Sequence, residues 1–354
     1  MKIIVVMPVK NEEWILEKSL KAASFFADHI IVGDQDSIDR TPEICKKFPK
    51  VTYLINSDEY PGTKNRRQIL LDKARQLYGA GNIVFCLDAD EIPTANILKE
   101  PSWKNLLATL KPGQSVMLEW INLWRSPRKY RNDKSVWTKS FRYFVFKDDG
   151  KTNYTLGNVH ESRVPNAFSE NSLKYKNVKI MHFHFVLWSR MLSKQRHCRL
   201  MEKRVFPKKS FLAINARYWT TKDERSIILK DTPKFWLRPW QEKGIDIENF
   251  LENDLYWFDA EILQDFKKYG TEHFKWLDIW DVDWEKKRQI AIKRGIKELP
   301  DNEIKDPRPF YIKFYHKYLQ LLLGYDSFLY KIYRFLKRSR LSNLSRSFLT
   351  FKRK

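Results

Sequence analysis

The chain has 354 residues and carries 66 Lys and Arg against 43 Asp and Glu, which gives a formal net charge of +23 at pH 7. This length suits one large or two smaller domains, and a hydrophobic content of 43% excludes general disorder. The charge predicts an anionic partner, which leaves nucleic acid, a phosphorylated substrate and acidic lipid open.

The cysteines and the N-terminal residues indicate the cellular compartment in which the protein works. Cys45, Cys86 and Cys198 lack the spacing of metal ligands, and they fit a reducing cytosol. The apolar run after Met1 is too short for a signal peptide, and no uncharged apolar stretch approaches the roughly 20 residues that a membrane-spanning helix needs. We therefore expect a cytoplasmic protein without a spanning helix.

Short β-branched runs alternate with helical patterns over the first hundred residues, which predicts an α/β fold with a parallel sheet. The predicted strands cover residues 2–7, 29–32 (ending at Gly33-Asp34), 51–55 and 82–87, and the predicted helices cover residues 11–25, 40–48 and 62–78. Asn11 has the side chain of a helix N-cap. Aromatic-rich strands follow at residues 116–124, 136–147 and 178–185, and then a helix at 187–206. Together these elements predict a first domain over residues 1–206.

The rest of the chain divides into two parts. Residues 207–304 have a mixed pattern, which predicts a mainly helical extension. Residues 305–354 contain 13 basic and 2 acidic residues, and apolar side chains recur there every three or four positions. Such a basic amphipathic segment suits the surface of an anionic membrane, while packing of the same stripe against the protein body stays open.

Polar residues follow the predicted strands where each strand ends. They are Pro8-Val-Lys-Asn11, Asp34 and Asp88-Ala-Asp90, with Lys64 and Arg67 at the start of the long helix. A single Asp after a strand is commonly a turn residue, but ligands in open parallel sheets bind beyond the carboxyl ends of the strands. The coincidence of several such residues at one edge of the sheet favours a nucleotide site.

The Asp88-Ala-Asp90 triplet predicts a metal site. The outer side chains of an extended triplet point to the same side, so Asp90 can hold a divalent cation while Asp88 reaches the metal shell or a ribose. Lys64 and Arg67 share one helix face near an N-terminus, as binding of a pyrophosphate requires, although a solvated basic face is the alternative.

Three motifs carry a resemblance to a known family. Met7-Pro-Val-Lys-Asn-Glu12, Ile31-Val-Gly-Asp-Gln-Asp-Ser-Ile-Asp-Arg-Thr41 and Leu87-Asp-Ala-Asp-Glu91 resemble the family 2 glycosyltransferases of the GT-A fold. Within that family the chain is most similar to bacterial sugar transferases of the lipopolysaccharide and capsule type. The resemblance covers roughly the first 200 residues, and it extends to Val159-His-Glu161 and Met181-His182.

The resemblance implies a Rossmann-like sheet with helices on both faces. It also implies transfer with inversion from a UDP-, GDP- or dTDP-linked sugar, with Mg²⁺ or Mn²⁺, to a glycan or lipid-linked acceptor. Its nucleotide pocket would include the backbone of Pro8 and Val9, together with Glu12 and Asp34. We accordingly expect a polysaccharide-building enzyme, peripheral on the inner face of a membrane.

An inverting transfer needs one general base to take the proton of the acceptor hydroxyl. Glu161 is the predicted base, because it matches the His-Glu pair of the family; Glu91, Glu119 and Asp133 are alternatives, and a salt bridge of Glu161 with Arg142 or Arg163 stays open. His182 is a predicted metal ligand, since neutral imidazole suits Mn²⁺, with His184 as an alternative and a core histidine as the competing interpretation.

Two further sets of residues have both a functional and a structural interpretation. Trp120, Trp124 and Trp137 would lie where acceptor sugars could stack, and core packing is the alternative. The acidic residues Asp278, Asp281 and Asp283 match no metal-binding loop, and we interpret them as a turn between helices.

Other function classes fit less of the sequence. A nucleic-acid-binding protein would account for the charge, but the basic residues are not interleaved with aromatics in an RNA-binding signature, and no specific nucleic-acid partner is expected. A membrane-associated scaffold with a degenerate transferase domain is a further alternative, and the retention of Asp88, Asp90 and Glu161 argues against it. Among enzymes, a nucleotidyltransferase on a similar sheet is the nearest competitor.

Overall fold

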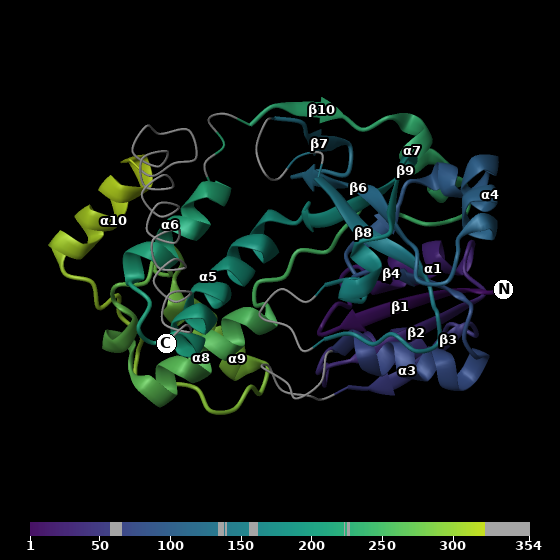
Figure 1. Cartoon of the computed structure of the whole chain (residues 1–354). Coiled ribbons are helices and arrows are strands. Elements are labelled where there is room, and N and C mark those ends of the chain that lie inside the picture. Colours follow the sequence, from purple (N-terminus) through teal and green to yellow (C-terminus); the bar gives the residue numbers. More distant parts are fainter. Residues whose placement is uncertain are drawn as a thin grey trace, which may run out of the picture. The chain divides into compact units, whose positions relative to one another are not determined.

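The fold is described from a computed structural model, which covers residues 1–56, 66–133, 138, 140–155, 162–222, 224 and 227–322 (Figure 1). The chain forms two compact units: residues 1–188 with 228–251, and residues 189–227 with 252–354. This division differs from the three consecutive domains expected from the sequence. The helix at 187–206 begins the second unit instead of closing the first domain, and residues 228–251 return to the first unit.

The first unit contains one mixed sheet. Among the described residues its strands follow the order β10-β7-β6-β8-β4-β1-β2-β3, and β9 pairs with both β6 and β5. The strands are β1 (Ile3–Val9), β2 (His29–Asp34), β3 (Val51–Ile55), β4 (Ile83–Cys86), β5 (Glu91–Pro93), β6 (Ser115–Trp124), β7 (Lys129–Arg131), β8 (Ser140–Lys147), β9 (Ser172–Phe185) and β10 (Leu229–Asp231).

Helices occur in both units. Those of the first unit are α1 (Leu16–Ser24), α2 (Thr41–Lys46), α3 (Arg66–Tyr78), α4 (Pro101–Thr109) and α7 (Lys234–Glu242). Those of the second unit are α5 (Trp188–Val205, from its second residue), α6 (Phe211–Lys222), α8 (Trp257–Tyr269), α9 (Trp284–Lys293) and α10 (Phe310–Leu322).

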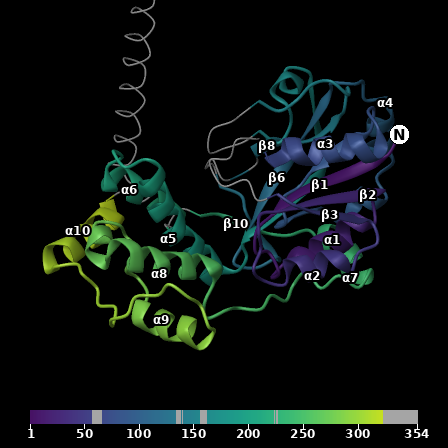
Figure 2. The same cartoon turned by 90° about the horizontal axis from the view of Figure 1, so that it is seen from below.

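The alternation of side chains along the parallel strands explains why helices cover both faces of the sheet. In β1, Val5 and Met7 join a buried cluster with Leu16 and Leu20 of α1, while Ile4 and Val6 join another cluster with Leu70 and Leu71 of α3. Figure 2 shows α3 on one side of these strands and α1 and α2 on the other. The expected α/β sheet with helices on both faces is confirmed.

The segment that returns from the second unit is tightly packed into the first. Trp240 of α7 is completely buried, and its indole Nε1 donates a hydrogen bond to the carbonyl oxygen of Pro93 (2.9 Å). Trp236 and Leu237 are buried in the same cluster as the β1 residues. The helix therefore supports the strand β5, which directly follows the Asp88-Ala-Asp90 triplet.

The expected N-cap at Asn11 is wrong. Helix α1 begins only at Leu16, and Asn11 has a backbone φ of 52°, outside the range that an N-cap residue adopts. Its Oδ1 instead accepts a hydrogen bond from the backbone N of Ile38 (2.8 Å), and its own N donates to Oγ of Ser37 (2.7 Å). Asn11 thus joins the loop after β1 to the loop after β2.

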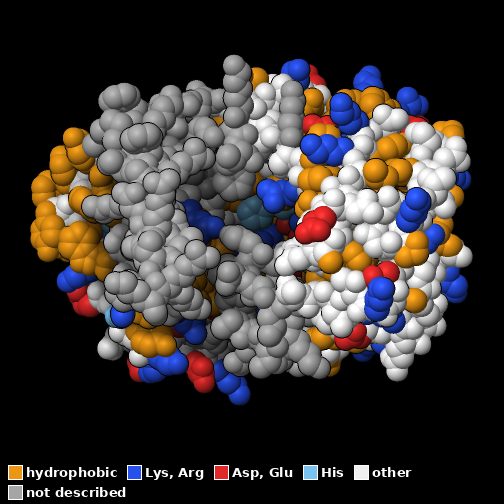
Figure 3. All heavy atoms as spheres, viewed as in Figure 1, with side chains coloured by type: hydrophobic (Ala, Val, Ile, Leu, Met, Phe, Trp, Pro, Cys, Tyr) orange, Lys and Arg blue, Asp and Glu red, His pale blue; other side chains and the backbone are white. Residues whose placement is uncertain are grey.

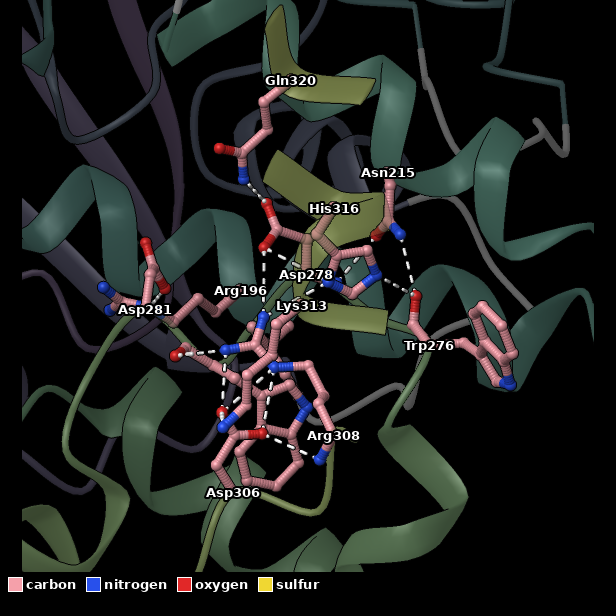
Figure 4. Close-up of polar contacts among 12 residues, drawn as sticks. Arg196, Asn215, Trp276, Asp278, Asp281, Asp306, Arg308, Lys313, His316 and Gln320 are labelled. Carbon is pink, nitrogen blue, oxygen red and sulfur yellow. Dashed lines mark hydrogen bonds and ion pairs between the residues drawn. The ribbon is translucent and has the colours of Figure 1, made fainter. Parts of the chain in front are cut away.

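The second unit is built around a buried carboxylate (Figure 4). Oδ2 of Asp278 accepts hydrogen bonds from Nε1 of Trp219 (2.5 Å) and Nε2 of Gln320 (2.7 Å), and the backbone N of Asp278 donates to Oδ1 of Asn215 (2.9 Å). The interpretation of this acidic stretch as a turn between helices is confirmed, because Asp283 accepts a hydrogen bond from the backbone N of Lys286 (2.9 Å) as the N-cap of α9.

One face of α10 is fixed to this centre and the other is exposed. Ile312 and His316 are buried, and Nε2 of His316 donates to the carbonyl oxygen of Trp276 (3.1 Å). The exposed side chains are Phe310, Tyr311, Phe314, Tyr318 and Leu321, and the apolar surface of α10 is visible at the left of Figure 3. None of the helices within the described ranges combines the length and the hydropathy needed to cross a bilayer.

Candidate functional site

The candidate site lies at the carboxyl ends of β1, β2 and β4. These strands are parallel neighbours in the order β4-β1-β2, so their ends meet at one edge of the sheet. The chain continues from β1 to β2 on one side and places β4 on the other side of β1, which makes the edge at β1 and β4 the point where the strand order reverses. Ligands of open α/β sheets bind at such a point.

Asp34 ends β2 and is held from two sides. Its Oδ1 accepts hydrogen bonds from the backbone N (3.2 Å) and the Oγ (2.5 Å) of Ser37, and its Oδ2 accepts one from the hydroxyl of Tyr53 (2.6 Å). The residue is buried. Oδ1 therefore stabilises the loop after β2, and Oδ2 joins the end of β2 to β3. Pro8 and Val9 lie alongside, because their Cα atoms pair with those of Gly33 and Asp34.

Glu12 lies in the loop between β1 and α1. Its Oε2 accepts a hydrogen bond from Nε1 of Trp14 (2.6 Å), and its backbone N donates to Oγ1 of Thr41 (2.9 Å) at the start of α2. The loops after β1 and β2, which adjoin the residues expected to line the nucleotide pocket, are thus joined to each other by hydrogen bonds.

Asp88 is held by two arginines. Nη2 of Arg67, on α3, lies 2.7 Å from its Oδ1, and Nη2 of Arg163 lies 2.8 Å from its Oδ2. Burial alone would raise the pKa of Asp88, but the charges of Arg163 and Arg67 outweigh it and lower the pKa to about 2. Arg67 therefore contacts the triplet directly, while Lys64 lies outside the described residues.

Glu91 is the second carboxylate of this ion network. Arg163 donates to both of its oxygens, from Nη1 to Oε2 (2.5 Å) and from Nη2 to Oε1 (2.7 Å). The indole of Trp120 also donates to Oε1 (2.7 Å), and the backbone N of Asp88 donates to Oε2 (2.9 Å). Burial raises the pKa of Glu91 despite the charge of Arg163. Glu91 thus acts as a structural anchor for the triplet.

Asp90 faces two histidines. Its Oδ2 lies 3.5 Å from Nε2 of His182 and 3.8 Å from Nδ1 of His184. One ligand atom from each of the three residues lies within 4.8 Å of the others. The pairing of β5 with β9 produces this arrangement, because Glu91 is in register with His182 and the backbone N of Phe183 donates to the carbonyl oxygen of Asp90 (2.8 Å).

The three donors fit a divalent cation. Metal–ligand distances of about 2.0–2.2 Å place neighbouring ligands about 3–4 Å apart, which is close to the spacing found here. One carboxylate oxygen and two imidazole nitrogens are a donor set that first-row transition metals accept. The predicted ligands Asp90 and His182 lie together, His184 joins them, and Asp88 is directed toward the two arginines.

The residues predicted as the general base and as the sugar platform have different outcomes. Glu161 and Trp137 lie outside the described residues. Trp124 is buried and stacks on Phe185 at a centroid distance of 4.6 Å, and Trp120 is buried and stacks on His182 at 4.3 Å. For Trp120 and Trp124 these contacts correspond to the packing alternative rather than to an open sugar platform.

Comparison with known families gives a match over part of the chain. The model of the family described as glycosyl transferase family 2 matches residues 4–106, which include β1 to β4 and the Asp88-Ala-Asp90 triplet. The first unit therefore contains a stretch that is similar to family 2 glycosyltransferases. Its α/β sheet with helices on both faces is the architecture expected for the GT-A fold, and the second unit supplies the expected helical part.

Solved structures resemble the chain more distantly. S. aureus TarS 1-349 is 12% identical over 84% of this chain and 88% of its own, with a TM-score of 0.39. Glucosyl-3-phosphoglycerate synthase from Mycobacterium tuberculosis, in complex with Mn²⁺ and UDP, is 21% identical over 34% of this chain and 44% of its own, with a TM-score of 0.25. HddC from Yersinia pseudotuberculosis is 11% identical over 52% and 94%, with a TM-score of 0.30. No curated protein matches the chain.

Sequence reasoning did not foresee the role of Arg163 or the anchoring role of Glu91. Arg163 lies 75 positions after Asp88, and no local pattern announces an ion pair over that separation. His184 was already an alternative ligand from the sequence, since His182 and His184 alternate with Phe183 on one strand and must share a face.

We predict that replacing Arg163 with Met destabilises the first unit. The change leaves the buried Glu91 without its counter-charge and leaves the partly exposed Asp88 with Arg67 alone, which costs about 3–5 kcal/mol, and a unit of this size should lose about 10 °C of melting temperature. Thermal unfolding followed by circular dichroism measures the loss. The exposed pair Arg238–Glu242 provides the control, because Arg238→Ala should leave the melting temperature unchanged.

A second variant distinguishes loss of charge balance from loss of packing. The double variant Arg163→Met, Glu91→Gln lacks one unpaired buried charge. Its melting temperature should therefore lie between those of Arg163→Met and the wild type. An equal or larger loss in the double variant would contradict the charge argument.

Proposed function

We propose that the protein transfers a sugar from a nucleotide-sugar donor to a glycan or lipid-linked acceptor, with a divalent cation and with inversion at the anomeric carbon. The observation that carries this proposal is the grouping of Asp90, His182 and His184 at the carboxyl end of β4 in a domain that matches family 2 glycosyltransferases. A cation bound there supplies positive charge to the departing diphosphate.

The loops after β1 and β2 are assigned to the nucleoside. Pro8, Val9 and Asp34 end the strands that lead into these loops, and Glu12 lies in the first loop; the hydrogen bonds between the two loops make the edge of the sheet rigid. Rigid loops support affinity because binding then orders few side chains. Arg67 and Asp88 form the adjoining ion pair, so we assign them to orienting the triplet and the ribose side of the donor.

Glu161 remains the proposed general base. Its support is indirect: Arg163, two residues later in the sequence, is anchored to Asp88 and Glu91 at the site. The alternatives are engaged elsewhere, since Glu119 pairs with Lys179, Asp133 pairs with Arg131, and Glu91 is bound by Arg163. In the proposed reaction the acceptor hydroxyl loses its proton to Glu161, its oxygen bonds to the anomeric carbon, and the bond to the nucleoside diphosphate breaks.

We predict that Asp90→Ala abolishes metal-dependent turnover of the donor without unfolding the chain. The carboxylate is the anionic member of the three-donor set, so its loss weakens binding of the cation and of the diphosphate that the cation holds. A thermal-shift screen with UDP, GDP and dTDP, with and without Mn²⁺, measures binding, because a ligand of the native state raises the melting temperature.

The exposed carboxylate of Glu43 on α2 gives the matched control. Glu43→Ala should keep the wild-type shift with nucleotide and Mn²⁺, whereas Asp90→Ala should lose the part that depends on Mn²⁺. Full turnover by Asp90→Ala would contradict the assignment of Asp90 to the metal site.

We predict that Glu161→Gln lowers sugar transfer by about 10²–10⁴-fold, the usual contribution of a general base. Binding of the nucleotide with Mn²⁺ should stay intact, because the amide has nearly the shape of the carboxylate. Glu119→Gln, in a residue paired with Lys179, should retain transfer. If Glu161→Gln transfers sugar at the wild-type rate, another group is the base.

We further propose that α10 and the basic chain after it bind an anionic membrane, where a lipid-linked acceptor would lie. On α10 the exposed apolar side chains lie opposite the buried Ile312 and His316, and Lys313 and Lys317 flank them. Residues 323–354 add nine basic residues and one acidic residue by sequence, although they lie outside the described ranges. An amphipathic helix followed by basic chain suits a surface of acidic lipids on the inner face of a membrane.

We predict that serine at Phe310, Phe314 and Tyr318 together reduces binding to vesicles containing phosphatidylglycerol by tenfold or more. These side chains are exposed, so the fold should persist, whereas removal of residues after 305 would also delete the buried Ile312 and His316. Vesicle co-sedimentation is the measurement, with Phe235→Ser on α7 as the exposed-aromatic control. Equal sedimentation of the triple variant and the wild type would exclude α10 as the membrane contact.

A further inference from the structure

One side chain beside the candidate metal site has no role so far. Asn122 of β6 is fully buried, and its Oδ1 lies 2.7 Å from Nδ1 of His182. The two residues are paired in register between the parallel strands β6 and β9. Trp120, two residues earlier on β6, covers one face of the same imidazole ring. Stacking on Trp120 therefore fixes the plane of the His182 ring, and the contact with Asn122 fixes its rotation within that plane.

The contact with Asn122 determines which nitrogen of His182 can bind a metal. A carboxamide oxygen accepts hydrogen bonds only, so the 2.7 Å contact requires the proton of the neutral ring to sit on Nδ1. Nε2 then carries a lone pair, and it is the atom that faces Oδ2 of Asp90 at 3.5 Å. The opposite tautomer would direct an N–H group toward the cation.

We propose that Asn122 is a positioning residue that presents Nε2 of His182 as a metal ligand, so that His182 and His184 together make the site prefer a transition-metal dication to Mg²⁺. Two imidazole ligands favour this class, since Mg²⁺ requires oxygen ligands and retains several waters. The inference rests on the proposed metal-dependent function and narrows it. It concerns metal affinity and selectivity, which are measured without any acceptor.

Two substitutions separate positioning from packing. Asn122→Leu keeps the approximate volume and removes the acceptor, whereas Asn122→Asp keeps an acceptor oxygen at the same place. Loss of an outer partner of a ligating histidine weakens metal binding by about 10–100-fold. We expect that loss in Asn122→Leu and near wild-type affinity in Asn122→Asp. A purely structural role gives the reverse order, because a new buried charge disturbs the fold more than leucine does.

The experiment is a titration of the full chain with Mn²⁺, followed by the electron paramagnetic resonance signal of the free ion. A competing titration with Mg²⁺ tests selectivity, and Mn²⁺ should stay bound at about a 100-fold excess of Mg²⁺. Long-range ¹H–¹⁵N NMR of the metal-free wild type tests the tautomer directly, with a proton expected on Nδ1 of His182 and none on Nε2.

The outcomes separate the two levels of the proposal. Absence of Mn²⁺ binding by the wild type overturns the metal-dependent function, and this inference with it. Binding by the wild type with equal affinity in Asn122→Leu, or a proton on Nε2, overturns the role of Asn122 and leaves the proposed function intact. Displacement of Mn²⁺ by an equal concentration of Mg²⁺ overturns the selectivity.

Discussion

The guanidinium of Arg163 bridges the buried carboxylate of Glu91 and the partly exposed carboxylate of Asp88, which would otherwise repel each other across the turn after β4. Arg67 adds a second positive charge, so the network contains two cations and two anions. Removing one member of such a set leaves an uncompensated buried charge, which is far more costly than the loss of an exposed pair. The positions of Asp90 and of the β5–β9 pairing depend on this balance.

The same network explains why Asp88 and Asp90 have different contacts. From their spacing, Asp88 and Asp90 were expected to point to the same side of an extended segment, with Asp90 on the metal and Asp88 on the metal shell or a ribose. In the fold, Asp88 has an arginine at each oxygen, and Asp90 faces the imidazoles of His182 and His184. The side chains that determine this outcome come from α3 and from the chain beyond β8, far from the triplet in sequence.

The parallel half of the sheet could be predicted because its signals are local. Residues 51–55 were predicted as a strand and form β3, and the strands around Ile31 and Phe85 differ from expectation by only one or two residues at their ends. What depended on tertiary contacts could not be predicted. Asn11 has a side chain typical of a helix N-cap, yet its hydrogen bonds with Ser37 and Ile38 hold its backbone at a positive φ. Pairing of β5 with β9 has no sequence signal, because three residues are too few for a pattern.

The return of α7 to the first unit has a consequence for how the protein is made. Trp240 is buried beneath β5, and residues 189–227 of the other unit precede it in the chain. During synthesis, the first unit cannot be completed until residues up to 251 have left the ribosome, by which time part of the second unit already exists. A gene fragment ending after β9 would therefore encode every strand end of the candidate site but lack the helix that supports β5, and the first unit cannot be exchanged between proteins as a simple N-terminal module.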